Sequence, residues 1–398
     1  MPERGASTAA PEAALPLLAV AGFASMVAMR LCDAMLPALG QSFGVPAAQT
    51  SVAVSAFALA YGVMQLLAGP LGDRFGKPRV IAAAAFTCGL AAFGAALAPD
   101  LGALALGRAA MGGAAAGIIP LTMAWIGDQV PWERRQVVLA RLLGYTVGGM
   151  MTGAWAGGAV ADLLGWRWAF VAVGLLLVGA ALGIRSRPLA APPAGAAGLP
   201  YGRQVAAILA GGAARRLYAV TLAEGALVFG VIAFVPSLLH ERFALPLSSA
   251  GAVLALFGLG GFAYARSAGW LLRRWAPAQL ALVGGALLCA AFATLAWMPH
   301  WGWALPAALV GGLGYYLLHG CLQTCATQVS SVARGTAVSL FACALFFGQS
   351  VGVSAMAAAM ARGLAAPCIG AAGVALLALA LYFSRLPVLR APAGATSQ

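Results

Sequence analysis

Residues 69–79 read GPLGDRFGKPR, and long apolar stretches lie on both sides of them. The stretch combines three glycines, two prolines, one acid and three basic residues within eleven positions. Glycine allows the backbone to reverse and two helices to approach closely. The stretch therefore predicts a polar turn between two apolar helices.

The composition of the whole chain fits such helices. Its 398 residues are 62% hydrophobic and 8% charged, whereas a typical soluble domain is about 25% charged. This composition predicts a membrane protein with many spans. The net charge of +13 comes with no basic helix, aromatic RNA-binding box or zinc-ligand cluster, so we expect no nucleic-acid partner. The seven cysteines lie in or beside apolar runs, without metal spacing, and no metal site is expected.

A helix needs about 20 apolar residues to cross about 30 Å of hydrocarbon. The runs of that length show no alternation of period two, which disfavours a β-barrel. We therefore expect an all-α integral membrane protein with twelve transmembrane helices. The predicted spans are 15–38, 50–69, 79–98, 101–126, 137–161, 166–185, 216–238, 248–270, 278–298, 302–328, 336–361 and 367–384.

The basic residues predict the orientation of these spans. With both termini in the cytoplasm, most lysines and arginines fall in cytoplasmic segments, and the outer side keeps only Arg167, Arg242 and Arg362. This asymmetry follows the positive-inside rule and accounts for most of the net charge. We expect a bacterial-type inner membrane with both termini cytoplasmic.

The chain is also an internal repeat. A shift of about 200 residues aligns Gly69 with Gly269 and Arg74 with Arg274. Two such copies predict two pseudo-symmetric six-helix bundles, related by an axis along the membrane normal. The Pro-, Ala- and Gly-rich stretch after the sixth span predicts a linker. The expected division is a cytoplasmic tail at 1–13, a first bundle at 14–186, a cytoplasmic linker at 187–214, a second bundle at 215–385 and a cytoplasmic tail at 386–398.

The turn at 69–79 resembles the signature loop of the major facilitator superfamily, G-x-L-x-D-R-x-G-[RK]-x-[RK]. In that family the loop is a conformational latch on the cytoplasmic side, with its acid against the N-terminus of the eleventh helix. The resemblance implies this role for Asp73, whose attraction to a helix N-terminus would be worth roughly 0.3–1 kcal/mol. In the second copy Arg273 stands in its place, so only one latch keeps its acid. The matching positions are Gly69, Leu71, Asp73, Arg74, Gly76, Lys77 and Arg79.

Two further stretches extend the resemblance over the whole chain. RAAMGGAAAG, from Arg108, looks like the fourth-helix motif of the superfamily, with Met111 where a glutamine is frequent. GGMMTGAWAGG at 148–158 looks like the fifth-helix motif of its drug:proton antiporters, although Ala154 replaces the motif's proline. The resemblance implies export, but close helix packing explains the same glycine spacing. The matching glycines are Gly149, Gly153, Gly157 and Gly158.

Few charged residues lie inside the predicted spans, and each costs about 2.5–3.5 kcal/mol at a helix centre. Asp33 and Arg108 lie at similar depths from the outer ends of their spans, so we expect them to be able to pair, with Arg30 one turn deeper on the face of Asp33. Glu224 and His319 lie at matched depth in the inner half. These five residues either couple transport to protons or only fix helix packing. They occupy the first, fourth, seventh and tenth spans, which line the central cavity in the superfamily.

Aromatic and amide side chains supply further candidates for a substrate cavity. Several share a helix face with one another, and for each the alternative to ligand contact is ordinary packing. The candidates are Tyr61, Gln65, Trp155, Tyr316, Gln323 and Gln349.

The sequence holds no nucleotide-binding loop and no nucleophile with a base, so we expect neither an enzyme nor a pump driven by nucleotide hydrolysis, and no cofactor. It predicts a secondary active transporter with alternating access, driven by a proton gradient, that exports a small amphipathic or cationic compound. The alternatives are proton symport or uptake of a small metabolite and, from another class, a non-transporting receptor or scaffold on the same fold. The expected partners are a small-molecule substrate and the lipid bilayer, with the chain a monomer.

Overall fold

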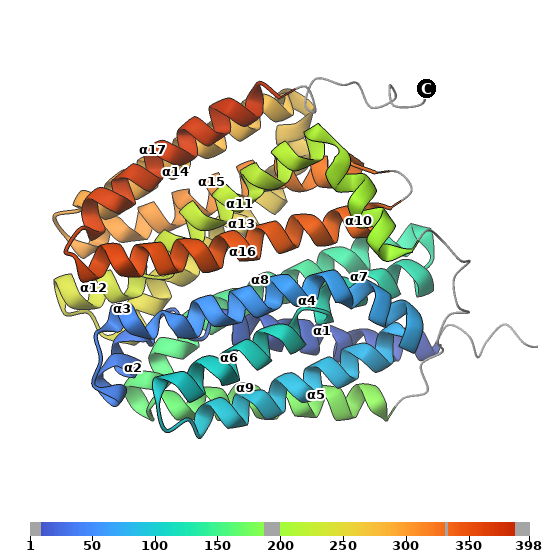
Figure 1. Ribbon diagram of the computed structural model, residues 1–398, viewed down its shortest axis with the longest axis horizontal. Helices are drawn as coiled ribbons and strands as arrows, with labels where there is room; N and C mark the ends of the chain where they lie inside the picture. The colour runs from blue at the N-terminus through green and yellow to red at the C-terminus, as the bar shows by residue number, and fades with distance from the viewer. Residues whose placement is uncertain (1–8, 187–199, 331–332, 387–398) are drawn as a thin grey trace, which may run out of the picture. The chain divides into compact units, whose positions relative to one another are not determined.

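The computed structural model describes residues 9–186, 200–330 and 333–386. Every regular element in these ranges is a helix (Figure 1). Residues 1–8 and 387–398 of the predicted tails and residues 187–199 of the predicted linker lie outside the described residues. The remaining part of the predicted linker contains the helix α10 (Tyr201–Ala210).

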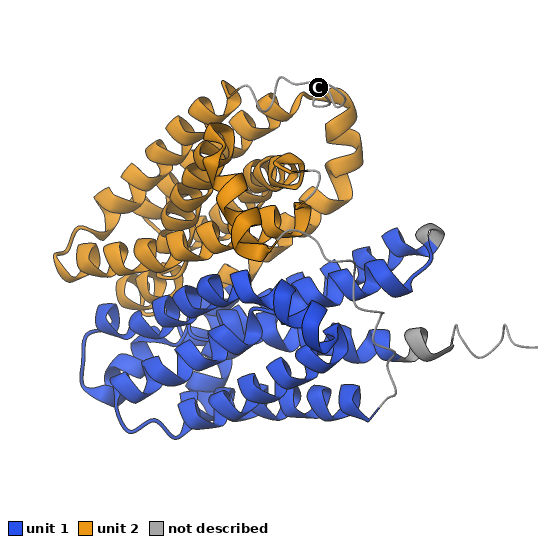
Figure 2. Cartoon of the chain, turned by 45° about the vertical axis from the view of Figure 1, so that its right-hand side comes forward, with its two compact units in different colours: residues 1–199, 245–252 blue, residues 200–244, 253–398 orange. Residues whose placement is uncertain are grey.

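The chain forms two compact units (Figure 2). Unit 1 holds the described residues before 187 together with Leu245–Ala252. Its helices are α1 (Ala9–Arg30), α2 (Leu36–Phe43), α3 (Ala47–Thr50), α4 (Val52–Phe75), α5 (Lys77–Ala96), α6 (Leu101–Ala115), α7 (Ile118–Gln129), α8 (Trp132–Leu163) and α9 (Trp166–Arg185).

Unit 2 holds Pro200–Ala244 and the described residues from Val253 onward. After α10 its helices are α11 (Gly212–Ile232), α12 (Val235–Phe243), α13 (Leu247–Arg274), α14 (Pro277–Trp297), α15 (Ala304–Gln328), α16 (Arg334–Ala361) and α17 (Ala365–Ser384), with a 3₁₀ turn at Trp301–Trp303. The first residues of α13 belong to unit 1 and the rest of this helix to unit 2.

The prediction of an all-helical membrane fold with twelve spans is confirmed. Among the described residues, eleven helical segments are long and apolar enough to cross a membrane, and the shorter apolar helix Ala14–Arg30 supplies the first span. Many glycines on these helices lie against the backbone of a neighbouring helix, as expected where small residues let helices approach closely in lipid.

The first span, predicted as one helix over 15–38, is divided in two. α1 ends at Arg30 and α2 begins at Leu36, with a turn between them. The cause is Pro37, which has no N–H to donate and whose ring collides with the carbonyl of residue 33. Pro236 has the same effect in the second copy, where α11 ends at Ile232 and α12 begins at Val235.

The stretch 69–79 is less of a loop than the sequence predicts. α4 continues through Pro70 to Phe75, and α5 begins at Lys77, so Gly76 alone separates the two helices. Gly76 has a φ of 89°, which only glycine adopts without strain. Pro78 in the first turn of α5 has a φ suited to a helix start.

The repeat is visible in individual contacts. In unit 1, a Cβ atom on Gly112 would meet the carbonyl of Phe57. In unit 2, a Cβ atom on Gly312 would meet the carbonyl of Phe257. The two glycines are 200 positions apart, and so are the two phenylalanines. The close approach of α4 to α6 therefore recurs between α13 and α15.

Candidate functional site

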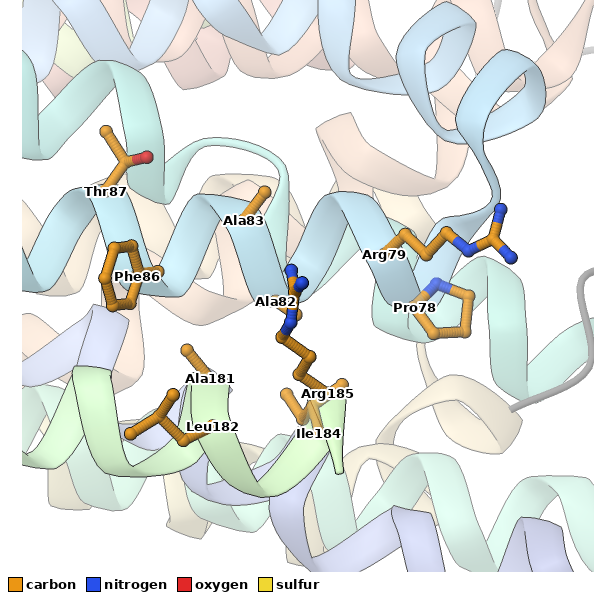
Figure 3. Close-up of a pocket in the computed structure, with 10 residues that line it drawn as sticks. All are labelled: Pro78, Arg79, Ala82, Ala83, Phe86, Thr87, Ala181, Leu182, Ile184 and Arg185. Atoms are coloured by element: carbon orange, nitrogen blue, oxygen red, sulfur yellow. The ribbon is translucent and has the colours of Figure 1, made fainter. Parts of the chain in front are cut away.

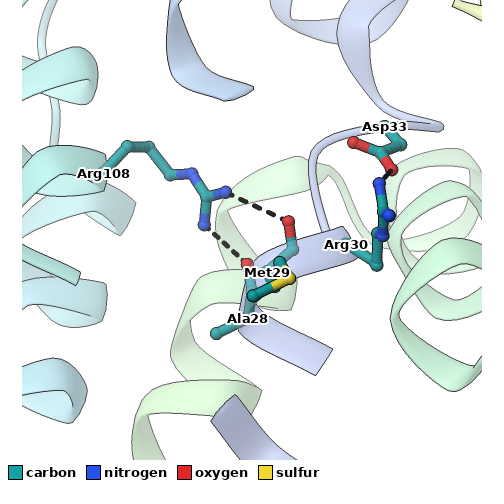
Figure 4. Close-up of polar contacts among 5 residues, drawn as sticks. All are labelled: Ala28, Met29, Arg30, Asp33 and Arg108. Carbon is teal, nitrogen blue, oxygen red and sulfur yellow. Dashed lines mark hydrogen bonds and ion pairs between the residues drawn. The ribbon is translucent and has the colours of Figure 1, made fainter. Parts of the chain in front are cut away.

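The break in the first span holds a buried ion pair. Arg30 is the last residue of α1, and Asp33 lies in the turn that follows. The Nη1 atom of Arg30 lies 3.1 Å from Oδ2 of Asp33 (Figure 4). Asp33 is fully buried and Arg30 is 7% exposed. The two residues are three positions apart in the sequence, and both lie in the buried interior of unit 1 where the first span breaks.

Arg108 on α6 is fully buried and does not pair with Asp33 as predicted. Its guanidinium donates to the carbonyls of Ala53 (2.9 Å), Ala28 (2.7 Å) and, more weakly, Met29 (3.4 Å). Figure 4 shows the guanidinium joined to the carbonyls of Ala28 and Met29, whereas Asp33 is joined to Arg30.

The helix break explains the Met29 acceptor. In a continuous helix, the Met29 carbonyl would receive the N–H of Asp33. That N–H instead donates to the carbonyl of Arg30, at 3.2 Å. The Met29 carbonyl is thereby released, and the Arg108 guanidinium also lies 4.3 Å above the ring of Phe57. Arg108 therefore has acceptors for its donors without a carboxylate.

Unit 2 holds a second buried pair, between α11 and α15. Nδ1 of His319 lies 3.0 Å from Oε2 of Glu224, which is fully buried. The imidazole stacks on Tyr315 with 4.9 Å between ring centroids and contacts Phe341 at 5.3 Å. Residues 95 positions apart are thus brought into contact in an aromatic surround.

Several buried acceptors in both units have no hydrogen-bond partner within the ranges that the structure describes. The carboxylate and amide oxygens among them are Oδ1 of Asp33, Oε1 of Glu224, Oε1 of Gln65 and Oε1 of Gln349. A buried polar atom normally has a partner, so each of these is available to a water molecule or a ligand donor. In the same described ranges, no three His, Cys, Asp or Glu side chains gather as possible metal ligands.

The predicted cavity residues divide by burial. Tyr61, Gln65 and Gln349 are buried, whereas Trp155 and Gln323 are exposed. Tyr316 packs against α13, because a Cβ atom on Gly261 would collide with its ring.

Two aromatic residues were missed. Phe57 stacks on Tyr61 and lies under Arg108, and Tyr315 stacks on His319. The spacing of four residues between Tyr315 and His319 was a usable signal, since such residues share a helix face. The position of Phe57 under Arg108 had no signal in the sequence.

The stretch 69–79, the predicted latch loop, has ion contacts in unit 1. The Nζ atom of Lys77 lies 2.7 Å from Oδ2 of Asp128, on α7, and 3.7 Å from Oδ1 of Asp73. The Asp73 side chain is 73% exposed, and Arg74 lies over the ring of Phe75. Asp128 was missed, although an acid at the predicted cytoplasmic end of the fourth span was a usable signal.

The fifth-helix glycines form a packing stripe on α8. Cβ atoms on Gly149, Gly153 and Gly157 would meet the carbonyls of Phe23, Val27 and Leu31, which are spaced by four residues along the first span. The glycine spacing is therefore accounted for by close contact with α1 and the turn that follows it.

The fourth matching glycine, Gly158, faces the first turn of α13, where a Cβ atom would meet the Leu247 carbonyl. One turn further along α8, Asp162 accepts hydrogen bonds from the backbone N–H groups of Leu247 (3.3 Å) and Ser248 (2.7 Å). An acid at a helix N-terminus is a stabilising cap.

Comparison with known proteins gives a family for this arrangement. The family model for the Major Facilitator Superfamily matches residues 18–353. An uncharacterized transporter of this type, YceJ of Bacillus subtilis, is 27% identical over 81% of this chain and 83% of its own length.

Two relatives with described functions match shorter stretches. The puromycin resistance protein of Streptomyces alboniger is 33% identical over 38% of this chain. The multi-drug resistance efflux pump PmrA of Streptococcus pneumoniae is 29% identical over 40% of this chain. The matched part spans only 31% of the length of the first protein and 41% of the second.

Solved transporters share the fold. The nucleoside transporter NupG superposes with a TM-score of 0.76 at 14% identity, over 93% of this chain and 98% of that one. A bacterial homologue of the human lysosomal transporter Spinster has a TM-score of 0.74 at 20% identity, over 96% and 93% of the two chains. At such identities the likeness concerns the fold alone.

Proposed function

The chain belongs to the major facilitator superfamily, a family of membrane transporters rather than enzymes, and we propose that it is a proton-coupled exporter of a small amphipathic or cationic compound. In this proposal the transporter works by alternating access, in an inner membrane with both chain termini in the cytoplasm. The observation that carries the coupling is the buried Glu224–His319 contact.

A proton-coupled transporter needs a buried group that gains a proton from one side and loses it to the other. Both Glu224 and His319 can titrate, and one proton shared between them makes the pair neutral. A neutral pair is tolerated in a dry site, and contact with water makes release of the proton less costly. The pair therefore has two accessible states.

The Arg30–Asp33 pair is a weaker candidate for this role. It is already neutral, and arginine keeps its charge in proteins. A proton on Asp33 would leave a buried positive charge, with Arg108 adding a second cation in the same unit. In the proposal, Arg30 and Asp33 stabilise the broken first span, and Glu224 and His319 carry the proton.

Two features support the substrate class and the direction. Oδ1 of Asp33 and Oε1 of Glu224 are buried acceptors without a partner among the described residues, and a cationic donor suits them. Tyr315, which stacks on His319, offers apolar contact and cation–π attraction near the second of these acceptors. Export is supported by relatives whose names state puromycin resistance and multidrug efflux.

The test is transport by the full chain in proteoliposomes under an imposed pH gradient alone. An antiporter accumulates substrate in vesicles that are acidic inside, whereas a symporter requires the opposite gradient. A panel of fluorescent organic cations serves as the first screen. Glu224→Gln is expected to reduce gradient-driven accumulation at least tenfold while substrate exchange without a pH gradient continues.

Glu241→Gln is the matched control, because Glu241 is an exposed acid on α12 of the same unit. It is expected to transport like the wild type. Gradient-driven accumulation that survives Glu224→Gln would remove this pair from coupling. Wild-type protein that transports no compound with either gradient would favour the non-transporting alternative.

A further inference from the structure

A pocket lies away from both buried pairs, where the first turns of α5 face the last turns of α9 in unit 1. Its volume is about 750 Å³, and the two helices that line it are packed against each other (Figure 3). None of the predicted coupling or cavity residues lines it. The basic residues predict that this end of both helices faces the cytoplasm.

Two arginines supply the charge of the pocket. Arg79 projects from the first turn of α5, and Arg185, the last residue of α9, extends toward α5 (Figure 3). Both are exposed, and neither has an ion pair or side-chain hydrogen bond in the part of the chain that the structure describes. No acid lines the pocket. The pocket therefore presents two uncompensated positive charges.

Apart from Thr87, the rest of the wall is apolar. Phe86 lies seven residues after Arg79, or about 10 Å further along the helix, and Leu182 lies one turn before Arg185. Both are exposed although they belong to helices that span the membrane. The pocket thus changes from cationic at the helix ends to apolar toward the membrane interior.

This order of groups matches an anionic phospholipid. We infer that the pocket binds one such lipid of the cytoplasmic leaflet, with its phosphate at the end of the pocket that Arg79 and Arg185 line and an acyl chain along Phe86 and Leu182. Basic pockets between transmembrane helices at this side of a membrane suit anionic head groups. A zwitterionic lipid fits less well because the wall has no acid for its amine. A free phosphate would leave the apolar wall unused.

The experiment titrates the delipidated full-length protein in detergent with phosphatidylglycerol or phosphatidylcholine of identical acyl chains, and native mass spectrometry counts the bound lipids. We expect one phosphatidylglycerol to bind at least tenfold more tightly than phosphatidylcholine. A surface arginine contributes about a fivefold factor, so Arg79→Gln and Arg185→Gln should each weaken binding about fivefold, and the double variant about twenty-five-fold.

Two further variants separate the pocket from general attraction to positive charge. Arg273→Gln removes an exposed arginine at the end of α13 and should leave binding unchanged. Ala83→Phe fills the pocket while keeping both arginines, and should also weaken binding. Equal affinity for the two lipids, an equal loss in Arg273→Gln, or unchanged binding in Ala83→Phe would overturn the proposal. Displacement of the lipid by millimolar inorganic phosphate would identify a free-anion site instead.

Discussion

The two units share a fold but use buried charge in different ways. In unit 1, Arg108 bonds to backbone carbonyls at a broken helix, and Arg30 pairs with Asp33 three residues away. In unit 2, the equivalent break at Pro236 carries no charge, and Glu224 reaches across to His319 on another helix. The position equivalent to Arg108 is Ala308.

The two units therefore differ in whether their buried groups keep a fixed charge or can gain and lose a proton. The unit 1 cations are arginines, which remain protonated: Arg30 pairs with Asp33, and Arg108 bonds to three backbone carbonyls, of which a helix break releases that of Met29. The unit 2 pair consists of two groups that titrate. A duplicated scaffold can thus keep its helix contacts in both copies while the copies take different electrostatic roles.

The largest expected effect is on stability and separates the two units. Asp33→Asn removes the carboxylate that pairs with the buried Arg30 guanidinium, so unfolding should become easier by about 3–5 kcal/mol. Glu224→Gln leaves a histidine that can stay neutral, and should change stability by about 1 kcal/mol. Chemical unfolding of both purified variants in one detergent measures the contrast.

A larger loss of stability in Glu224→Gln than in Asp33→Asn would contradict this comparison. An Asp33→Asn protein as stable as the wild type would show that the pair does not hold the helix break. If that variant also binds and exchanges substrate but loses its response to a proton gradient, Asp33 couples transport, as the sequence predicted. Accumulation of substrate by the variant under a pH gradient alone would exclude that role.

The next largest loss of stability should be the same in both units, because it concerns helix–helix contacts that the two copies share. A Cβ atom on Gly153 would meet the Val27 carbonyl, and one on Gly352 the Ala226 carbonyl. Gly153→Ala and Gly352→Ala should each destabilise by about 1–3 kcal/mol, as overpacked positions do.

Gly148→Ala is the control for the glycine variants, since no neighbour lies within 4 Å of a Cβ atom there. Alanine favours a helix, so this variant should be unchanged or slightly more stable. A marked difference between the losses in Gly153→Ala and Gly352→Ala would show that the two copies do not share this contact energetically.

The smallest effect on stability should occur at the latch loop. Asp73 is largely exposed, and its contact with Lys77 is worth less than about 1 kcal/mol. Asp73→Asn should therefore unfold like the wild type, while its turnover in proteoliposomes falls if the loop has the role that the family resemblance implies. Arg273→Gln changes the equivalent position of the second copy and should leave turnover intact. Equal turnover in Asp73→Asn and wild type across several pH gradients would contradict the latch.

Much of the fold could be predicted from the sequence because its causes are local. Hydropathy defines the spans, since every backbone polar group in lipid must be satisfied within a helix. Pro37 and Pro236 end helices through their own rings, and Gly76 reverses the chain through its own φ. The Arg30–Asp33 contact is equally local, because residues three apart share a helix face.

Only the tertiary structure decided which distant groups meet. Matched depth suggested Asp33 with Arg108 and Glu224 with His319 equally, yet only the second pair is in contact. Depth follows from counting residues, but contact also depends on how each helix is rotated about its axis. The Met29 carbonyl became an acceptor for Arg108 only because the neighbouring helix breaks there. Rotation and exposed backbone arise when helices pack, so the span sequences specify how far into the membrane a charge lies, and packing specifies its partner.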